Sequence, residues 1–113
     1  MTIDENVMGQ WQHMLGNPTG SALAGIGQIQ RRGERDPTSV QTIKDSREAY
    51  LIACQELLLP EADFKDYHPT ETDLNFLQRL YEKAQQIDWE VEEAVRELSE
   101  SLRNYTGYKG IIG

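Results

Sequence analysis

Apolar residues recur three or four positions apart along most of the chain, which is the spacing of one face of an α-helix. No run of four or more β-forming residues alternates between apolar and polar, so the pattern predicts no strand. Residues 1–113 are too few for two ordinary domains. The sequence therefore predicts a single all-α domain that forms a small, elongated helical bundle.

Local sequence signals predict three helices in the N-terminal half of the chain. A capping box at residues 2–5 is expected to open a short helix, which the sequence Gly16-Asn17-Pro18 ends. A second short helix is expected over residues 20–31. Asp36 followed by Pro37 favours a helix start, so a central helix is predicted over residues 37–59.

The longest apolar pattern predicts one C-terminal helix over residues 71–105. Its coiled-coil-like face consists of Leu77, Leu80, Ala84, Ile87, Val91, Ala94, Leu98 and Tyr105. A straight helix of this length measures about 52 Å, which exceeds the width of a compact domain of this size. Either the helix kinks near Asp88-Trp89, or the surplus apolar face lies against another chain. The straight helix is favoured because no Pro or Gly interrupts the run.

Charge narrows the range of partners. The protein has a net charge of −8, and residues 51–113 carry six Lys and Arg against thirteen Asp and Glu. Such a surface repels duplex DNA and anionic lipid, so a protein partner or a second copy is expected, and nucleic acid only as part of a larger complex. The single cysteine, Cys54, lies among apolar residues and is expected to be a buried, reduced thiol. With neither a signal peptide nor a membrane-spanning run, a cytoplasmic location is predicted.

The small-residue segment 20–31 is the first candidate contact surface. It has neither the lysine nor the hydroxyl that a phosphate-binding loop requires after its glycines. Its small side chains let another backbone approach closely, either within the chain or from a partner. Leu23, Gly25 and Ile26 are the predicted contact residues.

Two further contact sites are predicted nearer the C-terminus. Trp89 lies just off the apolar face of the long helix, where a half-exposed tryptophan is typical of a partner contact. Residues 107–113 are predicted to form a non-helical apolar tail with Tyr108, Ile111 and Ile112. The tail either folds back on the protein's own core or docks in a neighbour's groove.

Three arginines, Arg31, Arg32 and Arg35, form a possible basic patch. They are explained by a solvated helix end, by pairing with the acidic face of a sister subunit, or by nucleic-acid contact. No aromatic residue that could stack on a base lies between Trp11 and Tyr50, which disfavours the last explanation.

Carboxylates offer the one enzymatic alternative. Glu90, Glu93, Glu97 and Glu100 share one predicted helix face, and Asp45 lies on the preceding long helix. Together they suggest a magnesium-dependent phosphohydrolase, whereas the simpler interpretation is a solvated acidic face in which Glu92 pairs with Arg96. The favoured function is a non-enzymatic interaction or assembly module without cofactor: an adaptor, a structural subunit of a homo-oligomer, or a small acidic inhibitor.

Overall fold

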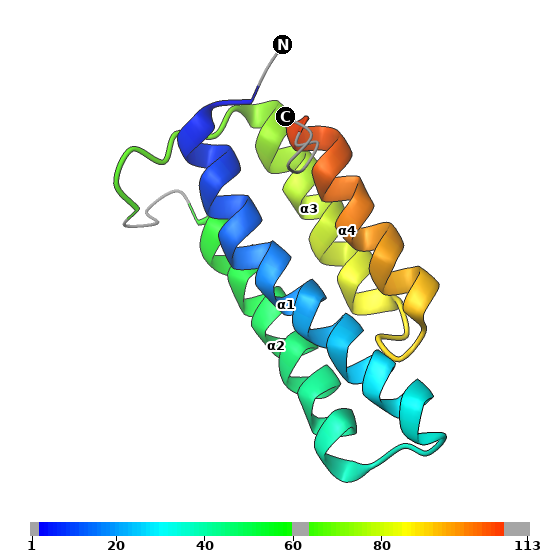
Figure 1. The fold of residues 1–113 in the computed structure, drawn as a ribbon. Helices are drawn as coiled ribbons and strands as arrows, with labels where there is room; N and C mark the ends of the chain where they lie inside the picture. The colour runs from blue at the N-terminus through cyan, green and yellow to red at the C-terminus, as the bar shows by residue number, and fades with distance from the viewer. Residues whose placement is uncertain (1–2, 60–63, 108–113) are drawn as a thin grey trace.

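The computed structural model describes residues 3–59 and 64–107, and these form four helices (Figure 1). The helices are α1 (Glu5–Arg32), α2 (Pro37–Leu58), α3 (Glu71–Gln86) and α4 (Glu92–Thr106). The described residues contain no strand, so the prediction of an all-α fold is confirmed. None of these helices combines the length and apolar character that crossing a lipid bilayer requires.

The bundle consists of two helical hairpins, α1–α2 and α3–α4, packed against each other (Figure 1). Helix α1 contacts both α2 and α4, and α3 contacts α2 more extensively than it contacts α4. The α1–α2 hairpin is the longer of the two, and its loop end extends beyond the α3–α4 hairpin (Figure 1). The principal dimensions of 44 × 32 × 22 Å describe a somewhat elongated bundle.

Helix α1 is a single helix of 28 residues, so the prediction of two short N-terminal helices is wrong. Pro18 lies inside α1 and is buried. Proline removes one helical hydrogen bond and usually breaks a helix. Here the buried face continues through it in one phase, from Trp11 and Leu15 to Ala22 and Ile26, and its burial outweighs the local cost.

Local capping chemistry fixes the other helix starts. Asp4, rather than the predicted Thr2, caps α1, and its carboxylate accepts hydrogen bonds from the backbone N–H groups of Asn6 and Val7. Asp36 caps α2 by accepting from the Ser39 N–H at 3.0 Å, as predicted. A capping box between Thr70 and Asp73 opens α3.

The straight C-terminal helix predicted over residues 71–105 is also wrong, because the chain turns back between α3 and α4. Trp89 lies in this turn with 4% of its surface exposed. Its indole Nε1 donates to the carbonyl of Ala84 at 2.9 Å, and its ring packs edge-on against Tyr50. The chain reverses direction here rather than kinking. As a result Val91, which was predicted on the apolar face, is 47% exposed, whereas Val95 is fully buried.

An aromatic cluster ties the loop before α3 to α1 and α2. Trp11 Nε1 donates to the hydroxyl of Tyr67 at 3.1 Å, and that hydroxyl donates to the carbonyl of Leu57 at 2.8 Å. On its other side, Trp11 stacks with Phe76 and Tyr105, which themselves stack at 4.0 Å. Side chains from α3, α4 and the loop therefore pack around the Trp11 indole of α1, and the Tyr67 hydroxyl connects this cluster to the end of α2. Cys54 is buried, as predicted.

Replacement of Trp89 by alanine tests the role of the α3–α4 turn. We expect Trp89→Ala to lower the free energy of unfolding by about 3–5 kcal/mol, because it leaves a cavity beside Tyr50. The exposed neighbour supplies the control, since Val91→Ala should change stability by less than about 0.5 kcal/mol. Urea unfolding measures both, and similar losses in the two variants would contradict the placement of Trp89.

Stability is expected to fall at high pH because tyrosine hydroxyls are buried. Burial raises the pKa of Tyr67, and burial together with the hydrogen bond that Tyr105 donates to Asp73 raises the pKa of Tyr105 to about 12. An unfolded tyrosine has a pKa of about 10. The folded state thus holds these protons more tightly, so this stabilisation is present below about pH 10 and is lost as pH rises toward 12.

Urea unfolding at increasing pH checks this expectation, with tyrosinate absorbance as a second readout. In the Tyr105→Phe variant the loss of stability above about pH 10 should be smaller. A stability that is flat across this interval would contradict the prediction.

Candidate interaction surface

The side of α1 that faces away from the bundle carries no formal charge over most of its length. Residues 6–30 of α1 contain no Asp, Glu, Lys or Arg. We define the outer face of α1 as its exposed residues Gly9, His13, Asn17, Gly20, Ser21, Ala24 and Gln28, with the adjoining half-buried Gly16 and Gly27. Solvent-exposed helix faces ordinarily carry charged side chains, so this face is atypical of a surface that contacts only water.

Four glycines form a line along this outer face. Gly9, Gly16, Gly20 and Gly27 are separated by seven, four and seven residues, and at 3.6 residues per turn they fall within about 40° of one another. A Cβ atom added at Gly9, Gly16 or Gly20 would meet nothing within 4 Å, and at Gly27 it would approach only the Arg31 guanidinium. Each glycine costs about 1 kcal/mol of helix stability relative to alanine. Nothing within the described chain requires glycine at these four positions.

Gly25 differs from these four glycines, because it has an intramolecular reason to be glycine. A Cβ atom there would lie 2.9 Å from Cγ1 of Ile43 and 3.2 Å from the carbonyl oxygen of Ser39, both on α2. Gly25 therefore lets α1 and α2 approach closely, which is the intrachain form of the contact predicted for the small-residue segment. Ile26, 4% exposed, belongs to the same buried core.

Surface depressions flank the outer face of α1 on both sides. On the side of α4, a groove of about 190 Å³ is lined by Gln12, Gly16, Thr19, Gly20, Leu23, Ser99, Leu102 and Arg103. On the side of α2, shallower depressions are lined by residues that include Met14, Pro18, Ala49 and Ile52, of which Ile52 is 46% exposed. Gly16 and Gly20 of the glycine line border the groove between α1 and α4, which we call the α1–α4 groove.

The predicted contact residues fall into different environments. Leu23 is partly buried at the α1–α4 groove. Gly25, Ile26 and Trp89 are covered by the protein itself, so the expectation of a half-exposed Trp89 is wrong. Tyr108, Ile111 and Ile112 lie outside the described residues. Gly107, the first residue of the predicted tail, ends α4 in the left-handed conformation with φ of 72°.

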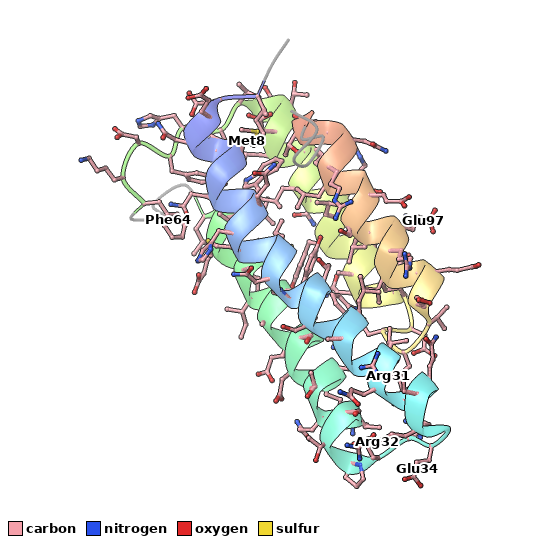
Figure 2. All side chains as sticks on the ribbon, in the orientation of Figure 1. Met8, Arg31, Arg32, Glu34, Phe64 and Glu97 are labelled. Atoms are coloured by element: carbon pink, nitrogen blue, oxygen red, sulfur yellow. The ribbon has the colours of Figure 1, made fainter. Side chains whose placement is uncertain are left out.

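The three arginines do not converge on one site. Arg35 donates from Nε and Nη2 to the two carboxylate oxygens of Glu90, at 2.7 and 2.6 Å, and so links the α1–α2 loop to the α3–α4 loop. This pair raises the pKa of Arg35 and lowers that of Glu90. Arg31 and Arg32 are exposed and lie at the end of α1 beside that loop (Figure 2).

The carboxylates are also dispersed. Glu90 lies in the α3–α4 turn rather than on a helix. Glu97 lies on α4 (Figure 2), and its carboxylate is 3.6 Å from Nζ of Lys83. Glu92 pairs with Arg96 at 3.0 Å, as expected of a solvated acidic face. Among residues 3–59 and 64–107, no three His, Cys, Asp or Glu side chains gather closely enough to share a metal ion. The magnesium hypothesis therefore finds no ligand set in that part of the chain.

The predicted contact segment 20–31 includes the C-terminal half of the outer face of α1, and the continuation of that face through Gly9, His13 and Gly16 was not predicted. The uncharged stretch and the regular glycine spacing both cross Pro18. Once Pro18 is taken as the end of a helix, Gly9 and Gly16 are assigned to one helix and Gly20 and Gly27 to another. Their shared line then disappears.

Alanine substitutions distinguish the two kinds of glycine. Gly16→Ala, with open space around the new methyl group, should raise the free energy of unfolding by about 0.5–1 kcal/mol in dilute solution. Gly25→Ala should lower it, because overpacking against Ile43 and Ser39 costs about 1–3 kcal/mol. Urea unfolding of both variants measures the difference, and effects of the same sign would refute the distinction.

Comparison with known proteins adds no assignment. No protein-family model matches the sequence, and neither a curated protein nor a solved structure is significantly similar to the chain.

Proposed function

We propose that the protein is a non-enzymatic helical interaction module that assembles with another protein chain through the outer face of α1 and the α1–α4 groove. The observation that supports this most directly is the line of four glycines. Each lowers the stability of α1, yet no contact within the described chain needs it. A backbone from a second chain that approaches α1 closely would give all four the same explanation.

The absence of charge supports the same proposal. Burying an ionised side chain against a partner carries a large desolvation cost, and the centres of protein interfaces are depleted of charged residues. The outer face of α1 has no such group to bury between Asn6 and Gln30. The net charge of −8 lies elsewhere, mainly on residues 51–113, so this face does not repel a partner of either sign.

The α1–α4 groove adds further contact residues for a partner beside the outer face of α1. It combines an apolar floor at Leu23 and Leu102 with polar groups at Gln12, Ser99 and Arg103. The side-chain amide of Gln12 donates to the Thr106 hydroxyl at 3.4 Å, across the two helices that form its walls. A helix seated on the glycine line would also reach side chains of α4, which enlarges the contact beyond α1 alone.

A charged residue on the outer face of α1 tests the proposal. Gly20→Arg has room for the new side chain and keeps good helix propensity, so the variant should fold. It should weaken association at least about tenfold, because an arginine would separate the two backbones and be desolvated. The matched control is Gln85→Arg, which adds the same charge at an exposed position of α3.

The measurement is quantitative isolation of tagged wild type, Gly20→Arg and Gln85→Arg from the cells that make the protein. Wild type and Gln85→Arg should retain the same complexes, either with the protein's own untagged copies or with another chain, and Gly20→Arg should lose them. If wild type, Gly20→Arg and Gln85→Arg all retain identical complexes, or if none of the three forms a complex, the proposed function is wrong.

A further inference from the structure

We infer that the partner of the outer face of α1 is a second copy of this chain, bound with its α1 antiparallel so that Gly16 faces Gly20 of the second copy. This inference rests on the function proposed above and specifies the partner. A symmetric pair must be self-complementary, because the same surface is used twice. The outer face of α1 meets this requirement in its spacing and in its charge.

The glycine spacing is the same read in either direction. The intervals of seven, four and seven residues place Gly9 opposite Gly27 of the second copy when Gly16 faces Gly20. All four glycines on each helix then meet a glycine, and two backbones can approach along about 27 Å of α1. A line of glycines that merely faced an unrelated helix would not need this symmetry.

Charges at the two ends of α1 select the antiparallel arrangement. The acidic residues are Asp4 at the cap and Glu5 in the first turn, and the basic residues are Arg31 and Arg32 in the last turn. In the antiparallel register, Glu5 lies level with Arg31 of the second copy, and both lie within about 40° of the glycine line. Asp4 and Arg32 are turned about 140° away from that line, so the contact relies on Glu5 and Arg31. A parallel pair would instead place acid beside acid and arginine beside arginine, with the two helix dipoles aligned unfavourably.

Among residues 3–59 and 64–107, no side chain is paired with Glu5, and the charged residues at both ends of α1 are exposed. Glu5, Arg31 and Arg32 are exposed, and Arg31 and Arg32 lie at the opposite end of α1 from Met8 (Figure 2). The Arg31 guanidinium lies 3.3 Å from the position of a Cβ added at Gly27, so it has to turn aside for Gly9 of the second copy to reach Gly27. Glu5 of the second copy arrives at the same level, where the displaced guanidinium can pair with it.

Disulfide formation between introduced thiols tests the register directly. Gly9→Cys and Gly27→Cys chains are purified separately and then mixed under mild oxidation. The mixture should give a covalent dimer, because positions 9 and 27 face each other and glycine-lined helices lie close enough for a disulfide. Neither variant alone should link, since its two thiols would be about 27 Å apart along α1. Native Cys54 is buried and does not compete.

Controls and light scattering complete the experiment. Gly9→Cys mixed with Gln85→Cys should not link, because Gln85 lies on α3. Wild type should show a mass of two 12.9 kDa chains that falls toward one chain on dilution. Linking of Gly9→Cys with itself would indicate a parallel pair and overturn the inference, and so would linking through Gln85→Cys.

The outcomes also separate this inference from the proposed function. Wild type could be monomeric at every concentration and bind a different protein that the Gly20→Arg variant no longer binds. That result would refute a second copy as the partner but would support the proposed interaction module. If the Gly20→Arg substitution changes none of the protein's assemblies, both the inference of a second copy and the proposed function are wrong.

Discussion

The structure depends on α1 remaining one helix through Pro18. Only a continuous α1 can present Trp11 and Leu15 near one end and Ala22 and Ile26 near the other as a single buried face. That face is covered by α2 on one side and α4 on the other. Thr19 assists locally, because its hydroxyl donates to the carbonyls of Leu15 and Gly16 in the turn that proline disturbs. Tertiary burial thus overrides a strong local signal for helix termination.

The sequence was sufficient where structure is decided locally. The cap at Asp36 depends on a few neighbouring backbone groups and is present as predicted, and the cap at Thr70 and the glycine at position 107 are equally local features. It was insufficient at Pro18 and Trp89, where long-range packing decides. The turn at Trp89 has no Pro or Gly to mark it, and it forms because the indole is buried against Tyr50 of α2.

The errors in the fold and in the candidate surface have a common origin. The long C-terminal helix left Trp89 on an apparent outer face, and the interruption at Pro18 divided the glycines between two helices. Leu23 was identified because the segment around it could be interpreted on its own. The outer face of α1 could not, since its symmetry extends over residues 9–27 and is visible only on an unbroken helix.

Gly16, Pro18 and Gly20 also affect how the protein reaches its native state. With these three residues within five positions, the middle of α1 has the lowest intrinsic helix propensity of the bundle. An isolated α1 segment would hold no continuous helix in water, so α1 is not a preformed unit onto which the others dock. Its centre becomes ordered only as α2 and α4 close around it, and the folding barrier therefore includes contacts between distant parts of the sequence.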